Sequence, residues 1–252
     1  MAGTNGLSGL RVLIPRGGDL GTRLASAVSA RDGVPVIAPA IEFIDASNSQ
    51  AVADACARLS AGEFDWVAIT SATTVGTLVH HGVQIPEQTR VAVVGPATGD
   101  AMLAAGFPVH FMPSTAFSAV GMIEEWPVAS GSVLLPQSAI AEPTLAEGLA
   151  GRGLDVTTVA AYDTIAVDWD DDVRRQWGNG AFATVLLTSA SVARAVAGQG
   201  VTVPEQTVIA CIGQSTASGA HAAGLPVHVV AETSTAEGLV DAAQKYLQTP
   251  TN

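Results

Sequence analysis

Short apolar runs alternate with segments of helical period along the whole chain. Val67-Ala68-Ile69 and Val91-Ala92-Val93-Val94 have the length and composition of buried strands. Leu20, Leu24 and Val28 recur at the spacing that places side chains on one face of a helix. Strands that alternate with helices are typical of a parallel sheet with helices on its faces. The pattern therefore predicts an α/β fold.

The second half of the chain repeats the first at an offset of 118 positions. Residues 64–72 (FDWVAITSA) recur as residues 182–190 (FATVLLTSA), and residues 82–89 (GVQIPEQT) recur as residues 200–207 (GVTVPEQT). A repeat of this length has the size of a small domain and not of a solenoid unit. We therefore expect two similar lobes, pseudo-duplicated, each with a parallel sheet, and a cleft between them.

Two segments, residues 34–44 and 156–167, are longer than an ordinary strand. The usual strand has about five to six residues. Extended segments of this length can leave one lobe and enter the other, so the lobe boundaries need not coincide with those of the repeat.

Charge and the two cysteines narrow the classes of function. The chain has 11 basic and 23 acidic residues and a net charge of −12, which argues against nucleic acid or an anionic membrane as partner. A small anionic ligand is still compatible with this charge if backbone N–H groups bind it. We expect Cys56 and Cys211 to be buried free thiols that act as small apolar residues.

The sequence also indicates a compartment. Residues 1–10 have neither the basic start nor the apolar stretch of a signal peptide, and no apolar run approaches the ~18 residues of a membrane span. These features predict a cytoplasmic protein.

Small hydroxyl residues follow four predicted strands, at the points where helices begin. The four turns are Thr70-Ser71-Ala72-Thr73, Gly95-Pro96-Ala97-Thr98, Thr188-Ser189-Ala190-Ser191 and Gly213-Gln214-Ser215-Thr216. In a parallel sheet such turns gather at the carboxyl ends of the strands, where helix amino termini offer N–H groups to an anion. The same residue types also cap helices without any ligand. The spacing predicts an anion-binding cleft, and it leaves capping open for each hydroxyl.

The order of these pieces resembles the uroporphyrinogen-III synthase family, over about Leu10 to Leu247. The resemblance rests on residues 12–16 (VLIPR), 65–72 (DWVAITSA), 94–98 (VGPAT), 161–164 (AYDT), 188–192 (TSASV) and 212–217 (IGQSTA). It implies an enzyme without a cofactor, a lyase of tetrapyrrole and heme biosynthesis, that cyclises linear hydroxymethylbilane to uroporphyrinogen III. The reaction loses water and inverts ring D.

The resemblance also implies an architecture. Two flavodoxin-like lobes are joined by a two-stranded linker, with residues 1–38 and 168–252 in lobe one and residues 39–167 in lobe two. It favours a monomer and leaves open a transient contact with hydroxymethylbilane synthase.

Particular residues follow from the same resemblance. Tyr162 matches the tyrosine proposed to assist departure of the substrate hydroxyl, although an ordinary strand aromatic is the alternative. Arg16 matches a basic residue after the first strand, and a solvated surface arginine is the alternative. The full set expected to bind substrate is Arg16, Thr70, Ser71, Ala72, Thr98, Thr188, Ser189, Ser191, Ser215 and Thr216.

Two other functions are compatible with the pattern. A two-lobed tetrapyrrole-binding or sensing module without catalysis is the main rival, and a small-anion binder of periplasmic type is a more distant one. His110 and His228 recur at one repeat position after Pro-Val, but no Cys or His cluster accompanies them, so no metal is expected.

Overall fold

The computed structural model describes residues 7–249, which form two compact units. Unit 1 takes the chain up to Glu42 and from Ile165 onward, and unit 2 is Phe43–Thr164. The chain passes from one unit to the other within β3 (Ile41–Asp45) and again within β7 (Asp155–Ala166). The expected lobe boundaries, after residues 38 and 167, lie just outside these strands, whereas the compact units divide inside them.

The sheet of unit 1 is parallel and has the strand order of flavodoxin. Its strands are β1 (Arg11–Ile14), β2 (Val34–Ile37), β8 (Thr184–Leu187), β9 (Val208–Cys211) and β10 (Val229–Val230). They lie in the order β10-β9-β8-β1-β2. If the strands of unit 1 are counted in chain order from one to five and read from the β2 edge, this is the doubly wound order 2-1-3-4-5. In this order, ligands bind at the carboxyl ends of the strands, where the strand order reverses.

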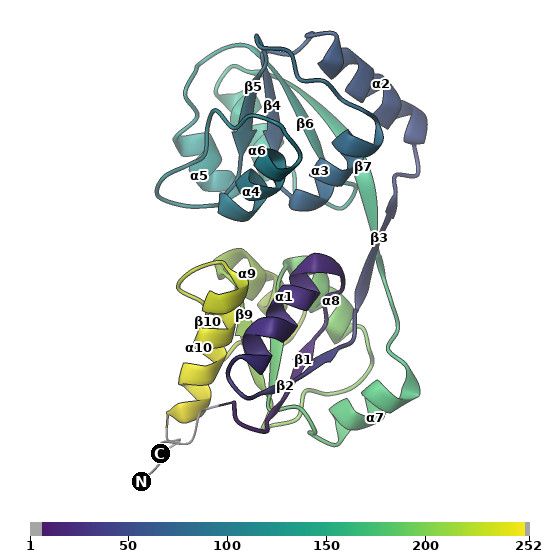
Figure 1. Ribbon diagram of the computed structural model, residues 1–252, viewed down its shortest axis with the longest axis vertical. Coiled ribbons are helices and arrows are strands. Elements are labelled where there is room, and N and C mark those ends of the chain that lie inside the picture. Colours follow the sequence, from purple (N-terminus) through teal and green to yellow (C-terminus); the bar gives the residue numbers. More distant parts are fainter. Residues whose placement is uncertain (1–6, 250–252) are drawn as a thin grey trace. The chain divides into compact units, whose positions relative to one another are not determined.

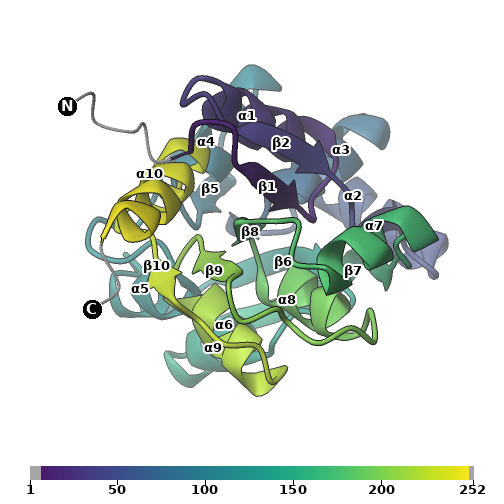
Figure 2. The same ribbon diagram turned by 90° about the horizontal axis from the view of Figure 1, so that it is seen from below.

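Helices cover both faces of this sheet. They are α1 (Gly18–Ser29), α7 (Asp171–Gly178), α8 (Ala190–Ala197), α9 (Gln214–Ala222) and α10 (Ala236–Gln248). Figure 2 shows α1 and α10 on one face and α8 and α9 on the other. Leu24, Val28 and Leu239 pack on Val12 and Ile14 in one apolar cluster. These buried helix faces are the amphipathic stripes that the spacing predicted.

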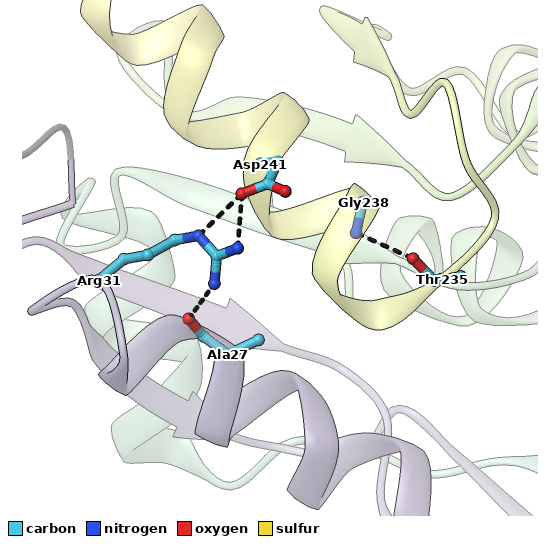
Figure 3. A network of polar contacts seen from close by, with 5 residues as sticks. All are labelled: Ala27, Arg31, Thr235, Gly238 and Asp241. Atoms are coloured by element: carbon cyan, nitrogen blue, oxygen red, sulfur yellow. Dashed lines mark hydrogen bonds and ion pairs between the residues drawn. The ribbon is translucent and has the colours of Figure 1, made fainter.

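A polar contact also joins α1 to α10. Arg31 Nε donates to Asp241 Oδ1 at 2.9 Å, and another guanidinium nitrogen of Arg31 donates to the Ala27 carbonyl at 2.7 Å (Figure 3). Thr235 caps α10 by accepting a hydrogen bond from the Gly238 amide at 3.0 Å. An exposed ion pair contributes about 0.2–1 kcal/mol, so apolar packing holds α10 in place.

The sheet of unit 2 has a closely related order. Its strands are β3, β4 (Trp66–Ile69), β5 (Arg90–Val93), β6 (Ser132–Ser138) and β7, in the order β3-β7-β6-β4-β5. The pairs β4–β5, β4–β6 and β6–β7 are parallel. Phe111 adds a parallel bridge to Ala92, where β10 stands in unit 1.

The helices of unit 2 again form two layers (Figure 1). They are α2 (Ser49–Ser60), α3 (Ala72–His80), α4 (Pro96–Ala104), α5 (Ala119–Glu124) and α6 (Thr144–Gly151). Leu59, Leu78 and Met102 pack on one face of the sheet, and Met122 and Leu149 pack on the other. Among the described residues, none of the helices has both the length and the apolar content that a bilayer span needs.

The repeat seen in the sequence is a repeat of structure. β4 corresponds to β8, β5 to β9, and α4 to α9, each pair at the offset of 118 positions. The α/β prediction with parallel sheets is confirmed. One detail is wrong: residues 34–44 are not a single extended piece, because Ala38-Pro39-Ala40 separates β2 from β3. Pro39 has no N–H to donate to a strand ladder.

Candidate functional site

Two serines begin helices directly after corresponding strands of the repeat, β4 and β8. Ser71 is the N-cap of α3 and accepts a hydrogen bond from the Thr73 amide at 3.2 Å. Ser189 is the N-cap of α8 and accepts one from the Val192 amide at 3.2 Å. Ser189 Oγ also lies 2.9 Å from Ser191 Oγ. The capping interpretation is confirmed for Ser71 and Ser189, and each cap occupies an amide that a ligand would otherwise use.

The threonines before these serines lie at the strand ends and do not cap the helices. Thr70 and Thr188 are half-buried at the ends of β4 and β8, and Ala72 is exposed. The Thr188 Oγ1 atom is buried and has no hydrogen-bond partner in the described part of the chain. A buried hydroxyl without a partner is uncommon in proteins, and this one lies beneath the surface of the turn.

The turns after β5 and β9 start with glycine instead of a capping side chain. Gly95 precedes α4 and Gly213 precedes α9, and within the described residues neither helix has a side-chain cap. Thr98 and Thr216 are buried, at only 6% and 4% exposed, whereas Ser215 is exposed. These turns therefore present backbone amides and Ser215 to a ligand, not the two threonines.

The turn after β1 has the same glycine start. Gly17 is the N-cap of α1, again without a side-chain cap among the described residues. Arg16 lies half-buried in this turn. A Cβ at Gly21 would lie 2.2 Å from the Arg16 carbonyl oxygen, so Gly21 permits the first turn of α1 to pack closely against Arg16.

The predicted tyrosine stands in β7 of unit 2. Tyr162 is 8% exposed, and its ring packs edge-on against Phe43 with the centroids 5.2 Å apart. The pairing of β6 with β7 shifts register between Gln137 and Ser138, so that Ser138 pairs with Tyr162. Such an irregularity changes the direction in which neighbouring side chains point.

A pocket of about 240 Å³ in unit 2 includes Tyr162. Its polar lining also contains Asp45, Ser49, Thr77, His80 and His81. Asp45, His80 and His81 were not among the residues predicted from the sequence. These three residues come from the end of β3 and the end of α3, and no local motif joins the two segments. The one feature of the sequence that could have indicated them is the pair of adjacent histidines.

The recurring histidines have a structural role in both units. The Val91 amide donates to His110 Nδ1 at 3.0 Å, and the Ile209 amide donates to His228 Nδ1 at 2.9 Å. Each imidazole thus accepts a hydrogen bond from a backbone N–H group of β5 or β9. Burial lowers the pKa of His228, and burial together with the charge of Arg90 lowers the pKa of His110.

The cysteines are free and buried, as predicted. Burial raises the pKa of the Cys211 thiol to about 11 and also raises that of Cys56. Neither thiol has the lowered pKa of a reactive cysteine.

Comparison with known proteins settles the family. A family model described as uroporphyrinogen-III synthase HemD matches residues 22–241. The chain belongs to the uroporphyrinogen-III synthase family. Members of this family are lyases of heme biosynthesis.

Individual relatives agree with this assignment. The chain is 27% identical over 248 residues to a protein of Oryza sativa subsp. japonica named "Uroporphyrinogen-III synthase, chloroplastic", covering 94% of this chain and 80% of that one. A crystal structure of a mutant uroporphyrinogen III synthase from Thermus thermophilus matches with a TM-score of 0.67 at 17% identity, covering 95% of this chain and 99% of that one. Uroporphyrinogen-III synthetase from Helicobacter pylori matches with a TM-score of 0.60 at 15% identity, covering 92% and 97%. The two structures show that the fold is the same.

Proposed function

We propose that this chain cyclises hydroxymethylbilane to uroporphyrinogen III by binding substrate carboxylates at the carboxyl ends of its strands. The observation that carries the proposal is that α1, α4 and α9 each begin at a glycine, with no side-chain cap in the described residues. The first amides of a helix have no partner within the helix and carry partial positive charge. They bind carboxylates readily.

This mode of binding suits the overall charge. With 11 basic residues against 23 acidic ones, the chain has few side-chain cations for a polycarboxylate. Backbone amides bind carboxylates without adding a residue of either charge. Arg16 and Ser215 add side-chain donors at two of the turns.

Positioning is the main catalytic task in this proposal. Without an enzyme, hydroxymethylbilane closes to isomer I, so the protein must bring its terminal carbon to the substituted position of ring D. Holding two reacting groups in the correct geometry supplies a large part of the rate enhancement of many enzymes. Carboxylate groups fixed at several separate turns would impose such a geometry on a flexible linear substrate.

Tyr162 supplies the proton donor. Its hydroxyl belongs to a side chain that lines the pocket of unit 2, and a phenol donates a hydrogen bond. We assign to it the hydrogen bond that assists departure of the substrate hydroxyl as water.

The compartment, oligomeric state and partner of the enzyme are part of the proposal. We propose a cytoplasmic monomer that makes a transient contact with hydroxymethylbilane synthase, which releases the substrate. The rice relative is named as chloroplastic, so localisation of the tagged full chain in its own cells is the direct test. Sedimentation of the purified chain tests the monomer.

One assay tests the reaction itself. Purified protein is given hydroxymethylbilane, the product is oxidised, and the isomers are separated by chromatography. We expect isomer III, in an amount that rises with protein concentration. A product that stays isomer I at high protein concentration contradicts the enzyme and leaves the tetrapyrrole-binding module as the function.

A further inference from the structure

The pocket beside Tyr162 lies wholly within unit 2. The residues around it come from the end of β3 and the start of α2, from the second half of α3, and from β7. Thr77 of α3 donates to the Ala161 carbonyl of β7 at 3.3 Å. This hydrogen bond ties the second half of α3 to the strand that carries Tyr162.

The size of the pocket limits its occupant. Its volume of about 240 Å³ is below the roughly 300 Å³ at which pockets for whole drug-sized molecules begin. A linear tetrapyrrole does not fit in it. One pyrrole ring with its side arms does, and the rest of a longer molecule would lie outside.

The lining has two kinds of polar group. Asp45 provides a carboxylate, which only accepts hydrogen bonds, and His80 and His81 provide imidazoles, each with at least one N–H donor. A pyrrole ring with acetate and propionate arms has the complementary groups. Its ring nitrogen donates one hydrogen bond, and its arms accept several.

We propose that this pocket binds the pyrrole ring that carries the hydroxymethyl group. Asp45 accepts a hydrogen bond from the ring nitrogen, and His80 and His81 donate to the acetate and propionate arms. The inference rests on the proposed function and names two contacts that the family resemblance did not supply: a carboxylate for the ring and an imidazole pair for the arms.

The carboxylate has a defined part in the chemistry. When the carbon–oxygen bond of the hydroxymethyl group breaks, its electron pair leaves with the oxygen. The oxygen takes a proton from the Tyr162 hydroxyl and departs as water. The positive charge that remains is shared with the ring nitrogen that faces Asp45, so this carboxylate stabilises the charge as it develops. After the terminal carbon bonds to the substituted carbon of ring D, the existing bridge bond at that carbon breaks and re-forms at the free α-carbon of the same ring, which inverts ring D. The proton that this α-carbon then loses returns to the Tyr162 oxygen.

Replacing Asp45 by asparagine tests this catalytic contact. Asparagine keeps the size of the side chain and removes its charge, so we expect Asp45→Asn to lower kcat for isomer III about tenfold, with KM within about twofold. Asp54→Asn removes the same charge from α2 outside the pocket and is expected to leave kcat unchanged. If kcat of the Asp45→Asn variant is within twofold of that of the unmodified chain, the role of Asp45 is overturned. In that case the proposed function still stands as long as the unmodified chain makes isomer III.

A binding experiment tests the pocket without the reaction. A single pyrrole with one acetate and one propionate arm is titrated into the full chain, and the imidazole signals of the five histidines are followed by NMR. We expect the signals of His80 and His81 to shift together and saturate, while those of His110, His221 and His228 stay in place. Asparagine still accepts a hydrogen bond from the ring nitrogen, so Asp45→Asn should leave this affinity within about twofold, in line with the small expected change in KM.

Two results of the titration overturn the inference. One is the absence of any saturable shift at His80 and His81. The other is an equal shift of all five histidines, which indicates a general change in solution. Because this readout needs no turnover, it decides the inference even if the chain forms no isomer III, and the two failures are thus distinguished.

Discussion

Replacing Gly213 by serine tests whether amides at the start of α9 bind substrate. The backbone of Gly213 is extended, with φ −175° and ψ 174°, a conformation that any residue adopts. The new Cβ would lie 3.0 Å from Ser234 Oγ, and rotation of the Ser234 side chain relieves this contact. A serine hydroxyl at the N-cap accepts a hydrogen bond from an amide of the first turn. It therefore competes with a substrate carboxylate for that amide.

Two effects of opposite sign follow from this competition. A serine N-cap is better than glycine by a few tenths of a kcal/mol, so the free energy of unfolding rises slightly. A hydrogen bond to a charged group contributes about 1.5–3 kcal/mol, and an exposed helix end contributes about 0.3–1 kcal/mol toward an anion. With a loss of about 1 kcal/mol at this turn, KM rises about fivefold while kcat changes little, because binding in the ground and transition states is weakened alike.

Gly213→Ala is the matched control, because alanine adds the same Cβ without the hydroxyl. The assay measures initial rates of isomer III formation at several concentrations of hydroxymethylbilane, with urea unfolding of each variant. We expect KM to rise for Gly213→Ser and to stay within twofold for Gly213→Ala. An equal rise in both variants indicates a steric cause. An unchanged KM in the serine variant refutes substrate binding by the amides of α9.

Three further predictions concern Tyr162, Ser189 and His228. Tyr162→Phe should slow isomer III formation about tenfold or more with an unchanged unfolding midpoint, and an unchanged rate removes Tyr162 from the mechanism. Ser189→Ala should lower the free energy of unfolding by about 1 kcal/mol in urea through loss of the α8 cap; no change would mean that the cap contributes nothing. His228→Leu should speed hydrogen exchange at the Ile209 amide, at a cost of about 1–3 kcal/mol, whereas His228→Asn keeps an acceptor and should protect it. The pKa of His228 is lowered from 6.5 in the folded chain, so the unfolded chain binds a proton at this imidazole more readily. The stabilisation by His228 is therefore present above pH 6.5 and is lost as the pH falls through the folded pKa. An Ile209 exchange rate that does not change with pH, once corrected for intrinsic exchange, would contradict this.

The alternation of apolar runs with segments of helical period was sufficient to predict the α/β class, and the repeat was sufficient to predict its duplication. Residues 64–72 and 182–190 matched because each contains a buried strand, a turn and the start of a helix, and these local features depend on nearby residues. The offset of 118 positions then carried over unchanged to β5 and β9. The long segment at residues 156–167 was also predicted well, since β7 is Asp155–Ala166.

Other parts of the site depend on contacts between distant segments, which local patterns do not contain. Whether a threonine points inward or outward is set by the packing of its helix, so the burial of Thr98 and Thr216 did not follow from their place after a strand. The grouping of Asp45 with His80 and Tyr162 depends on how α3 lies against β7. The break at Pro39 could have been found, because proline within a predicted strand favours an edge or an end.

The two kinds of turn differ in whether a side chain caps the helix that follows. At β4 and β8 a serine satisfies a helix amide internally, so these helix starts are stable without a ligand. At β5 and β9 both copies have glycine, and the corresponding amides have no side-chain partner among the described residues. A helix start without a cap costs stability unless water or a ligand satisfies it. Since the same difference occurs in both units, it belongs to the repeated unit itself, and a ligand at these turns, as proposed above, would satisfy the amides that the glycine starts leave without a side-chain cap.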